Sequence, residues 1–230
     1  MVAMIRAVFF DFFNTLAYFE PSREDTYAGI AADLGVKVTP AVIAEALPEA
    51  DAYWRAENFK QPVRQREQDD KVAVYREYGT RILAGTGATP DQALQMLATA
   101  FSRGWVFKSF GDAVPALRLV KERKLITGLI SNVGQEIDSY CLELGFEPLL
   151  DYKVTSFEVG YDKPRPEIFH LALDKAGVKA AEAIFIGDVY EQDIVGARGV
   201  GMKPILISRN GATDFDCVVI SDLSQVLDHI

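Results

Sequence analysis

The side chains of this sequence that could do chemistry are three aspartates, a lysine and an adjacent Ser-Asn pair. They are Asp11, Ser131, Asn132, Lys163, Asp188 and Asp193. Asp11 directly follows the apolar run AVFF. A carboxylate at the end of a buried strand is costly unless something there uses its charge. Asp11 therefore raises the question of which group at the end of this strand uses its charge.

The other groups also stand where a predicted strand ends or a predicted helix begins. Ser131 and Asn132 close the run LITGLI, and Lys163 precedes a predicted helix in GYDKPRPEIF. Asp188 follows AIFIG, and Asp193 comes five residues later. Each signal alone has an ordinary explanation as a cap, a turn or a helix start. Because ligands bind at the carboxyl ends of strands in open parallel sheets, the signals together predict one site on that rim.

Short apolar runs predict the strands that would position these groups. The runs span residues 7–10, 125–131, 152–156, 183–187, 204–208 and 217–220. Helical patterns lie between the later runs, at 113–124 and at 165–178, where a proline opens the segment and Gly177 ends it. Nearly all-apolar strands that alternate with helices predict an α/β fold with a doubly wound parallel sheet, covered on both faces.

Residues 18–107 differ from the rest, because they show amphipathic helical patterns and no convincing strand. Ser22 precedes one such segment, and Thr39 and Thr89 each precede a first-turn proline. Gln92 completes a capping box with Thr89. We therefore predict a core domain of residues 1–17 and 108–230, interrupted by an all-helical insert of about four helices at 18–107.

The composition of the chain limits the classes of binding partner and the cellular compartment that we expect. The chain of 230 residues carries a formal net charge of -9, which argues against nucleic acid and anionic membranes as partners. We see no apolar stretch of membrane-spanning length and no secretory signal. Cys141 and Cys217 lie in apolar surroundings, so we expect free thiols and a cytoplasmic location. An anionic substrate would need a local positive site to overcome the global charge.

The combined motifs resemble those of the haloacid dehalogenase-like hydrolase superfamily. They are DFFNTL at the first strand, LISN at a later strand end, the lysine of DKPRPEIF and the acidic motif GDVYEQD. The resemblance covers nearly the whole chain. It implies a Rossmann-like core, and the helical insert after the first motif is similar to the family's C1-type cap in the phosphatase-type branch.

The resemblance also implies a reaction. Asp11 would attack the phosphorus of a small phosphorylated metabolite, which would form an aspartyl-phosphate intermediate. Because two anions repel, Mg²⁺ would be required as cofactor, and it prefers oxygen ligands. By resemblance, Asp11, Asp188 and the backbone carbonyl of Phe13 supply those oxygens, and Asp193 holds the metal shell in place.

Further residues of these motifs would bind the substrate. Ser131, the backbone amide of Asn132 and the Lys163 ammonium would bind the phosphoryl oxygens as charge spreads over them. Lys163 would also lower the repulsion among the acids. Thr15, assigned to the substrate side of the site, would steady the turn by hydrogen bonding. Asn14 stands where the family usually has glycine, and asparagine tolerates a left-handed backbone better than most residues.

Phe13 is the main departure from the family pattern. Phosphatases of the superfamily usually carry a second aspartate here, which protonates the leaving oxygen and then deprotonates the attacking water. Phenylalanine can do neither. Because this position contacts the metal only through its backbone carbonyl, the magnesium site could survive the change.

Three alternatives to a phosphohydrolase stay open. A 2-haloacid dehalogenase is metal-free and has an aromatic residue, usually tyrosine, at the place of Phe13. Arg23 could then bind halide or carboxylate, or simply be an exposed arginine of a first helical turn. A phosphonate hydrolase would need a cap lysine such as Lys60 or Lys71. A non-catalytic regulatory protein would keep the motifs as a binding site. The sequence does not specify the substrate or the oligomeric state.

Overall fold

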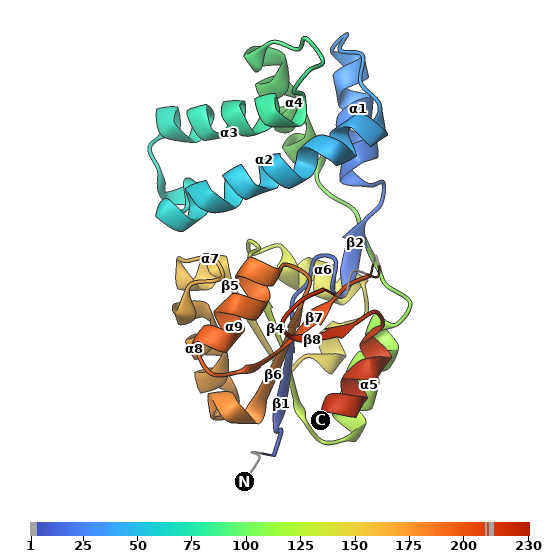
Figure 1. The fold of residues 1–230 in the computed structure, drawn as a ribbon, viewed down its shortest axis with the longest axis vertical. Helices are drawn as coiled ribbons and strands as arrows, with labels where there is room; N and C mark the ends of the chain where they lie inside the picture. Colours follow the sequence, from blue (N-terminus) through green and yellow to red (C-terminus); the bar gives the residue numbers. More distant parts are fainter. Residues whose placement is uncertain (1–3, 210, 212–213) are drawn as a thin grey trace. The chain divides into compact units, whose positions relative to one another are not determined.

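The computed structural model describes residues 4–209, 211 and 214–230, which form two compact units (Figure 1). The core unit combines the N-terminal residues through Tyr18 with Phe107–Ile230. The helical unit comprises Phe19–Val106. Among the described residues, no helix has the length and apolar character needed to cross a bilayer.

The core unit contains a sheet whose six described strands are all parallel to their neighbours. In spatial order these are β5 (Tyr152–Thr155), β4 (Ile126–Ser131), β1 (Ala7–Phe10), β6 (Ala183–Gly187), β7 (Lys203–Ile207) and β8 (Val218–Ile220). The predicted α/β fold with a doubly wound parallel sheet is therefore confirmed. The strand bounds differ from the predicted runs by a residue at some ends. Ser156, for example, begins a helix that Thr155 caps.

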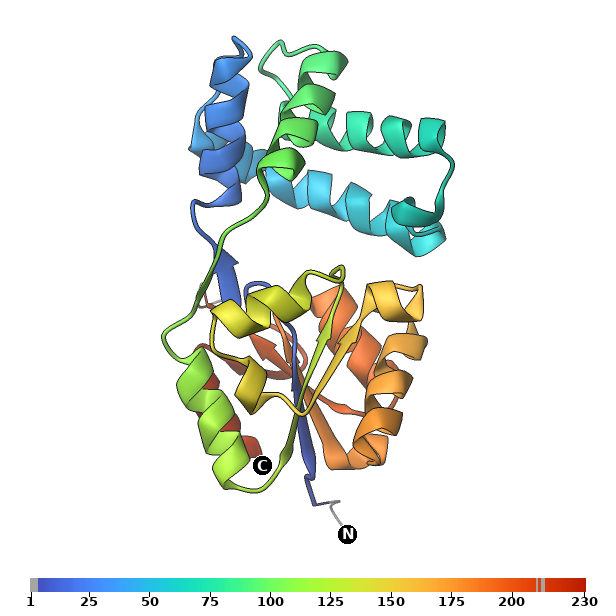
Figure 2. The same ribbon diagram turned by 180° about the vertical axis from the view of Figure 1, so that it is seen from behind.

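Helices cover both faces of this sheet, with α5 on one side and α8 and α9 on the other (Figures 1 and 2). The longer helices are α5 (Ala113–Glu122) and α8 (Pro166–Ala176). The shorter helical segments are α6 (Ile137–Glu143), η2 (Glu147–Leu149), α7 (Ser156–Val159), η3 (Ala180–Glu182), η4 (Tyr190–Ile194), α9 (Val195–Gly199) and η5 (Leu223–His229).

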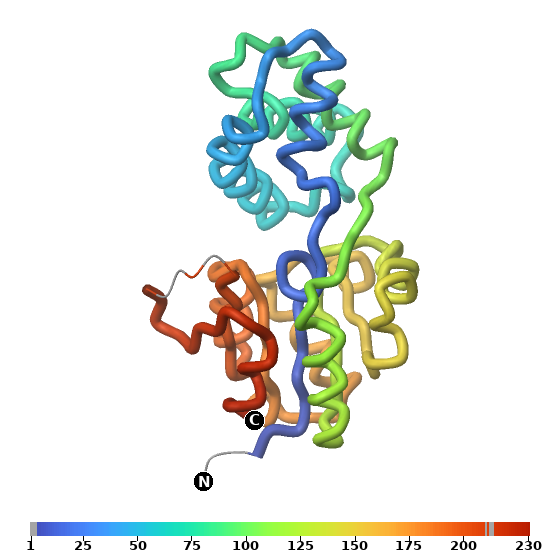
Figure 3. The backbone as a smooth tube through the Cα atoms, turned by 90° about the vertical axis from the view of Figure 1, so that its right-hand side faces the viewer, coloured from blue at the N-terminus to red at the C-terminus, as the bar shows by residue number. Residues whose placement is uncertain are grey.

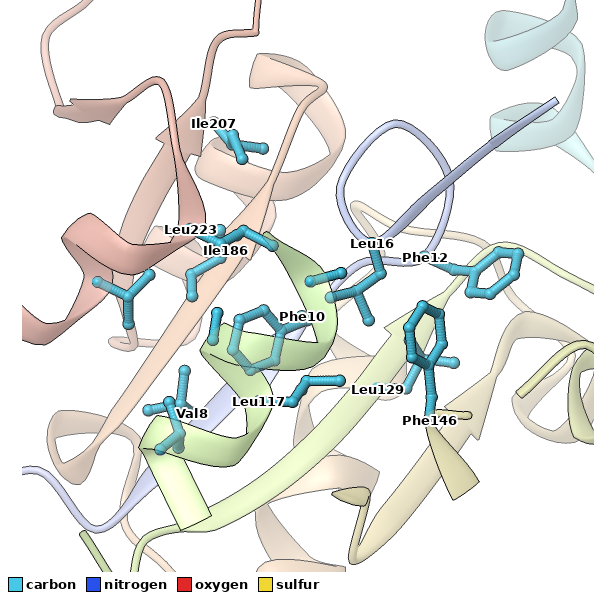
Figure 4. Close-up of a cluster of buried hydrophobic side chains, with 14 of the residues drawn as sticks. Val8, Phe10, Phe12, Leu16, Leu117, Leu129, Phe146, Ile186, Ile207 and Leu223 are labelled. Carbon is cyan, nitrogen blue, oxygen red and sulfur yellow. The ribbon is translucent and has the colours of Figure 1, made fainter. Parts of the chain in front are cut away.

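Strand β1 shows why the first apolar run has no polar alternation. Val8 and Phe10 point to the face covered by α5, where they join a cluster with Leu117 and Leu223 (Figure 4). Ala7 and Phe9 point to the opposite face, toward α8. Since side chains alternate along a strand and both faces are covered, every position of β1 is apolar and buried.

A glycine in β4 allows the large side chains of β1 to pack. Gly128 pairs with Phe9 in the sheet, and a Cβ atom on Gly128 would lie 2.5 Å from the Phe9 ring. That separation is too short for any side chain unless the ring moves. The interior of the sheet therefore uses Gly128 to accommodate Phe9.

The helical unit contains α1 (Arg23–Asp33), α2 (Pro40–Lys60), the short η1 (Val63–Gln65), α3 (Gln68–Ile82) and α4 (Pro90–Arg103). Its helix starts follow the sequence signals. Ser22 accepts a hydrogen bond from the amide of Asp25, and Thr89 forms a capping box with Gln92. The four α-helices bury a separate apolar cluster that includes Ile43, Tyr78 and Met96.

Two short strands were missed by sequence analysis. The strands β2 (Ala17–Phe19) and β3 (Phe107–Ser109) pair in a two-stranded sheet, and Figure 3 shows the two segments side by side. The expectation of no strand near these positions was therefore wrong. Each strand has three residues, which is too short for alternation to be recognised, and each is paired only because the chain returns beside itself.

The expectation that Arg23 is an exposed arginine was also wrong. Its Nη2 atom donates to both carboxylate oxygens of Asp51, at 2.9 and 3.0 Å, and its side chain is only 18% exposed. The hydroxyl of Tyr78 donates to the same carboxylate at 2.8 Å. Arg23 is thus part of a largely buried ion pair that joins α1, α2 and α3.

Candidate active site

The carboxyl ends of three adjacent strands bring the predicted functional groups together. Asp11 directly follows β1, Ser131 is the last residue of β4, and Asp188 directly follows β6. Because β4, β1 and β6 are parallel neighbours, their ends meet at one edge of the sheet. Lys163, from the segment before α8, reaches the same edge.

The side chains at this edge form a connected hydrogen-bond network. The Ser131 hydroxyl donates to Asp11 Oδ1 at 2.8 Å. The Lys163 ammonium donates to Asp11 Oδ1 and to Asp193 Oδ1, each at 2.7 Å. Lys163 and Asp193 are only 3% and 1% exposed, and Asp11 is 7% exposed. A single buried cation is thus shared between two buried carboxylates.

The charges of this network do not balance. Burial raises the pKa of Asp188 well above its usual value, and the negative charges of Asp11 and Asp193 raise it further. Burial likewise raises the pKa of Asp193, to about 6, although the charge of Lys163 opposes the shift. Burial alone would lower the pKa of Lys163, but the two carboxylates outweigh it and the net shift is upward. One ammonium therefore faces an excess of carboxylate charge.

The three aspartates have the arrangement of a possible metal site. Carboxylate oxygens of Asp11, Asp188 and Asp193 all lie within 4.8 Å of one another. Gly187 makes this packing possible, because a Cβ atom there would lie 2.3 Å from the Asp193 carboxyl group. Clustered carboxylates of this kind suit a hard cation, which would also compensate their charge. The residues present therefore fit a metal ion.

Local structure explains how Asp193 returns to the end of β6. The turn η4 is π-helical, and the amide of Asp193 donates to the carbonyl of Val189 at 2.8 Å. In the opposite direction, the amide of Val189 donates to Asp193 Oδ2 at 2.9 Å. These reciprocal bonds direct the Asp193 carboxylate back against Gly187 and toward Lys163.

Asn132 has a function in the structure that sequence reasoning did not include. Its side-chain Oδ1 accepts from the amide of Lys163 at 2.7 Å, and its Nδ2 donates to the Lys163 carbonyl at 3.2 Å. The expected contribution was its backbone amide, toward substrate. The side chain instead fixes the backbone that carries the lysine. A Ser-Asn pair at a strand end does not reveal such a distant partner.

In the loop after β1, the expectation for the backbone of Asn14 is confirmed and the expectation for the hydroxyl of Thr15 is wrong. Asn14 has a left-handed backbone with φ of 55°, as its place in the motif suggested, and its side chain hydrogen-bonds with Asp188. Thr15 was expected to steady the turn through its hydroxyl, but that atom is buried with no hydrogen-bond partner among the described residues. The loop is held through the Thr15 carbonyl, which accepts from Arg209 at 2.6 Å.

Phe13 is half-buried, and its side chain packs against the apolar cluster that contains Phe10 and Leu117. A short bridge pairs Phe13 with Ala17 across the loop. The ring offers no group that could transfer a proton. The position two residues after Asp11 is therefore part of the hydrophobic packing.

Comparison with known proteins agrees with this geometry. The model of the haloacid dehalogenase-like hydrolase family matches residues 5–201. A glyceraldehyde 3-phosphate phosphatase from Methanopyrus kandleri is 30% identical over 155 residues, which are 62% of this chain and 66% of that protein. Two further curated relatives match over 45% and 58% of their own lengths. The chain thus spans about half to two thirds of the length of these relatives.

Solved structures share the fold over almost the full chain. The HAD-hydrolase YfnB from Bacillus subtilis, solved bound to magnesium, has a TM-score of 0.74 and 16% identity, with 98% of each chain covered. The L-2-haloacid dehalogenase RSc1362 has a TM-score of 0.71 and 22% identity, with 99% of each chain covered. At these identities the likeness concerns the fold alone.

Proposed function

Because this chain belongs to the haloacid dehalogenase-like hydrolase family, we propose that it is a phosphohydrolase that acts through an aspartyl-phosphate intermediate. The substrate would be a small phosphorylated metabolite, as the name of the Methanopyrus kandleri relative suggests. The helical unit would be its cap, of the C1 type. The observation that carries the proposal is the buried Lys163 shared by Asp11 and Asp193, beside a third carboxylate.

We propose Asp11 as the nucleophile. Ser131 and Lys163 both donate to Oδ1 of Asp11, so we assign Oδ2 as the atom that attacks phosphorus. The Oδ2–P bond forms as the bond from phosphorus to the leaving oxygen breaks, and that oxygen departs with the electron pair. Water then attacks the phosphorus of the intermediate, which releases inorganic phosphate and restores the Asp11 carboxylate.

We propose Mg²⁺ as the cofactor, held by Asp11, Asp188 and the backbone carbonyl of Phe13. When bound, it would neutralise the repulsion between the carboxylates and the phosphoryl group. Asp193 would hold the metal's surroundings in place rather than bind the ion directly, because its carboxylate already accepts hydrogen bonds from Lys163 and from the amide of Val189.

The remaining polar groups would stabilise the transferring phosphoryl group. The Ser131 hydroxyl, the Asn132 amide and the Lys163 ammonium would bind its oxygens. Thr15 stands in the same loop but is proposed only as a structural member of it, because its buried hydroxyl cannot reach solvent. A cytoplasmic location and the exclusion of nucleic acid still rest on composition and remain predictions.

Phe13 shapes the substrate range. With no acid at this position, the leaving oxygen must depart unprotonated or take its proton from water. Acyl phosphates and aryl phosphates leave easily in that way, whereas alkyl phosphates do not. We therefore propose a preference for good leaving groups.

The test is a panel of phosphate esters, acyl phosphates, phosphonates and 2-haloacids, each assayed with Mg²⁺ and with chelator. Metal-dependent phosphate release supports the proposal. Phosphonate cleavage that is lost on replacing Lys60 or Lys71 would select the phosphonate hydrolase. Ligand binding without turnover of any compound would select the regulatory protein.

One observation favours a second candidate, a 2-haloacid dehalogenase. Phe13 places an aromatic side chain where that metal-free branch has one, and halide needs no proton to leave. The third carboxylate argues against it, since Asp188 lies beside Asp11 and Asp193 in an arrangement that suits a metal ion, which that branch does not use. Halide release that survives chelator would establish this alternative.

A further inference from the structure

Three successive carbonyl groups in the loop after Asp11 accept hydrogen bonds from distant parts of the core unit. The carbonyl of Asn14 accepts from Arg209 Nε at 3.2 Å, and that of Thr15 accepts from Arg209 Nη2 at 2.6 Å. The carbonyl of Leu16 accepts from the amide of Phe110 at 3.0 Å. The donors lie at the end of β7 and in the segment that follows β3. The loop is therefore held from outside along one edge of its backbone.

The guanidinium of Arg209 is itself held in place on two sides. It donates from Nη1 and Nη2 to the two carboxylate oxygens of Asp112, at 3.0 and 3.1 Å. Its Cζ atom lies 3.6 Å from the centroid of the Phe110 ring. Because the Asp112 carboxylate and the Phe110 ring fix the planar guanidinium, its N–H groups are already oriented toward the two loop carbonyls. We call Arg209, Asp112 and Phe110 the Arg209 clamp.

Asp112 is committed to this clamp rather than to its own helix. It stands at the N-cap position of α5, yet its side chain makes no capping bond there. Its Oδ2 atom instead accepts from the amide of Leu223 at 2.9 Å as well as from Arg209. The clamp therefore connects the loop after β1, the start of α5 and the start of η5.

The held loop leads directly to the candidate active site. Its own bonds close a tight turn, because the amides of Leu16 and Ala17 both donate to the carbonyl of Phe12. The Asn14 side chain hydrogen-bonds with Asp188, while the Asn14 carbonyl is bound by Arg209. A shift of this loop would therefore move both the Phe13 carbonyl and a hydrogen-bond partner of Asp188.

We propose that Arg209 is a positioning residue that fixes the loop after Asp11, and with it the geometry of the nucleophile and the metal ligands. Arg209 touches none of the reacting groups described above. It acts through the backbone carbonyls of Asn14 and Thr15. The inference rests on the proposed function for the roles of the nucleophile and the metal ligands and for the kinetic readout, whereas the hold of Arg209 on the loop rests on its hydrogen bonds alone.

The test is the variant Arg209→Gln, which keeps a polar side chain at this position but removes the guanidinium group. Hydrogen exchange of the segment 12–17 should become about tenfold faster, because local opening depends on the bonds that close it. Magnesium affinity, measured by calorimetry without substrate, should fall about three- to tenfold. With an activated phosphate ester, kcat should fall roughly 10- to 100-fold while KM changes little, since small misplacement of reacting groups is costly.

Arg6→Gln is the matched control, because Arg6 pairs with Glu182 in the same unit but contacts no atom of this loop in the described structure. It should leave all three readouts unchanged. If Arg209→Gln does not fold, Asp112→Asn carries the test and should speed exchange of the segment 12–17 about threefold. If the wild type releases no phosphate, the proposed function fails, and hydrogen exchange of the segment 12–17 still shows whether Arg209 holds the loop. Unchanged exchange and metal affinity in the folded variant, with only a lower Tm, would overturn the inference.

Discussion

The rim of the core unit and the interior of the helical unit both bury a cation against aspartate, but their charges balance differently. In the helical unit, Arg23 meets the carboxylate of Asp51 with two bonds, and neutral Tyr78 adds a third. At the rim, Lys163 is shared by Asp11 and Asp193, and Asp188 adds further negative charge. In the first cluster one arginine faces one carboxylate, although its Nε atom is buried without a hydrogen-bond partner among the described residues. In the second, one ammonium lies among three carboxylates, an arrangement that suits a cation.

The pKa shifts describe the same difference. In the helical unit, burial alone would lower the pKa of Arg23, but the neighbouring charges outweigh it, so the arginine stays charged. Burial raises the pKa of Tyr78, which stays neutral. At the rim, the raised pKa values of Asp188 and Asp193 show carboxylates whose ionised form is disfavoured. The excess of carboxylate charge over cationic charge, rather than the burial of an ion pair, therefore distinguishes the candidate site from the Arg23–Asp51 pair.

The strongest test of the rim is Asp11→Asn. We expect turnover to fall by at least about 10³, because an amide is a poor nucleophile. The fold should persist, as checked by circular dichroism and Tm, since the amide can still accept from Ser131 and Lys163. Retention of more than about a tenth of wild-type turnover in a clean preparation would exclude Asp11 as the nucleophile.

Removing one cation from each cluster sharpens the comparison. Lys163→Met should lower kcat by about 10²–10³, as expected for loss of a group that stabilises developing charge. It should also destabilise the metal-free protein, and Mg²⁺ should restore much of the Tm but not the activity.

Arg23→Met provides the matched change in the helical unit. It should lower the free energy of unfolding by about 1–2 kcal/mol, less than for a fully buried pair because both side chains are partly exposed. Its loss of Tm should be the same with and without Mg²⁺. A Mg²⁺-dependent recovery in both variants would remove the distinction between the clusters.

Asp188→Asn should move two measurements in opposite directions. Magnesium affinity should fall about 10- to 100-fold, because an amide oxygen binds a hard dication less well than a carboxylate does. The Tm of the metal-free protein should rise, since one of the mutually repelling carboxylates is gone. Calorimetric titration and thermal unfolding of the same preparation measure both effects. Unchanged affinity would place the metal elsewhere or favour the metal-free dehalogenase.

Phe13→Asp should change selectivity more than overall rate. Phosphate monoesters of graded leaving-group pKa should show a steep dependence in the wild type, because no acid protonates the leaving oxygen. The variant should flatten that slope and raise turnover of alkyl phosphates about tenfold, toward the lower end of what general acid catalysis provides. A shallow slope in the wild type would mean that another residue already acts as the acid.

The smallest expected effect is the pH dependence of stability. Asp193 has a folded-state pKa raised from 3.8 to about 6, so its contribution to stability is present below pH 4 and is lost as pH rises toward 6. The raised pKa of Asp188 acts in the same direction. Carboxylates with lowered pKa values make stability rise with pH and would mask this effect in a plain measurement of Tm. The contribution of Asp193 and Asp188 is therefore measured as the difference in Tm with and without Mg²⁺. Mg²⁺ should raise Tm more at pH 7 than at pH 4.5. An equal increase at both values would contradict the excess of carboxylate charge.

Local signals in the sequence determined the elements of this protein. The apolar runs predicted β1, β4 and β6, because a strand covered on both faces has no polar positions. Ser22 and Thr89 predicted helix starts, because capping partners lie within three residues. The order of the strand-end motifs identified Asp11 and Lys163 as members of one site, since parallel strand ends meet at one edge.

Only the tertiary structure decided which distant groups complete that site. Lys163 meets an aspartate 152 residues away, and Arg209 meets the carbonyl of Asn14 195 residues away. Nothing in the local sequence distinguishes Arg209 from a surface arginine, or shows that the Asn132 side chain holds the backbone of Lys163. Such bonds depend on which strand ends are neighbours and on what else lies within about 3 Å of each polar atom. Sequence periodicity and capping describe neighbours along the chain, whereas the balance of charge around Asp188 exists only once the chain has folded.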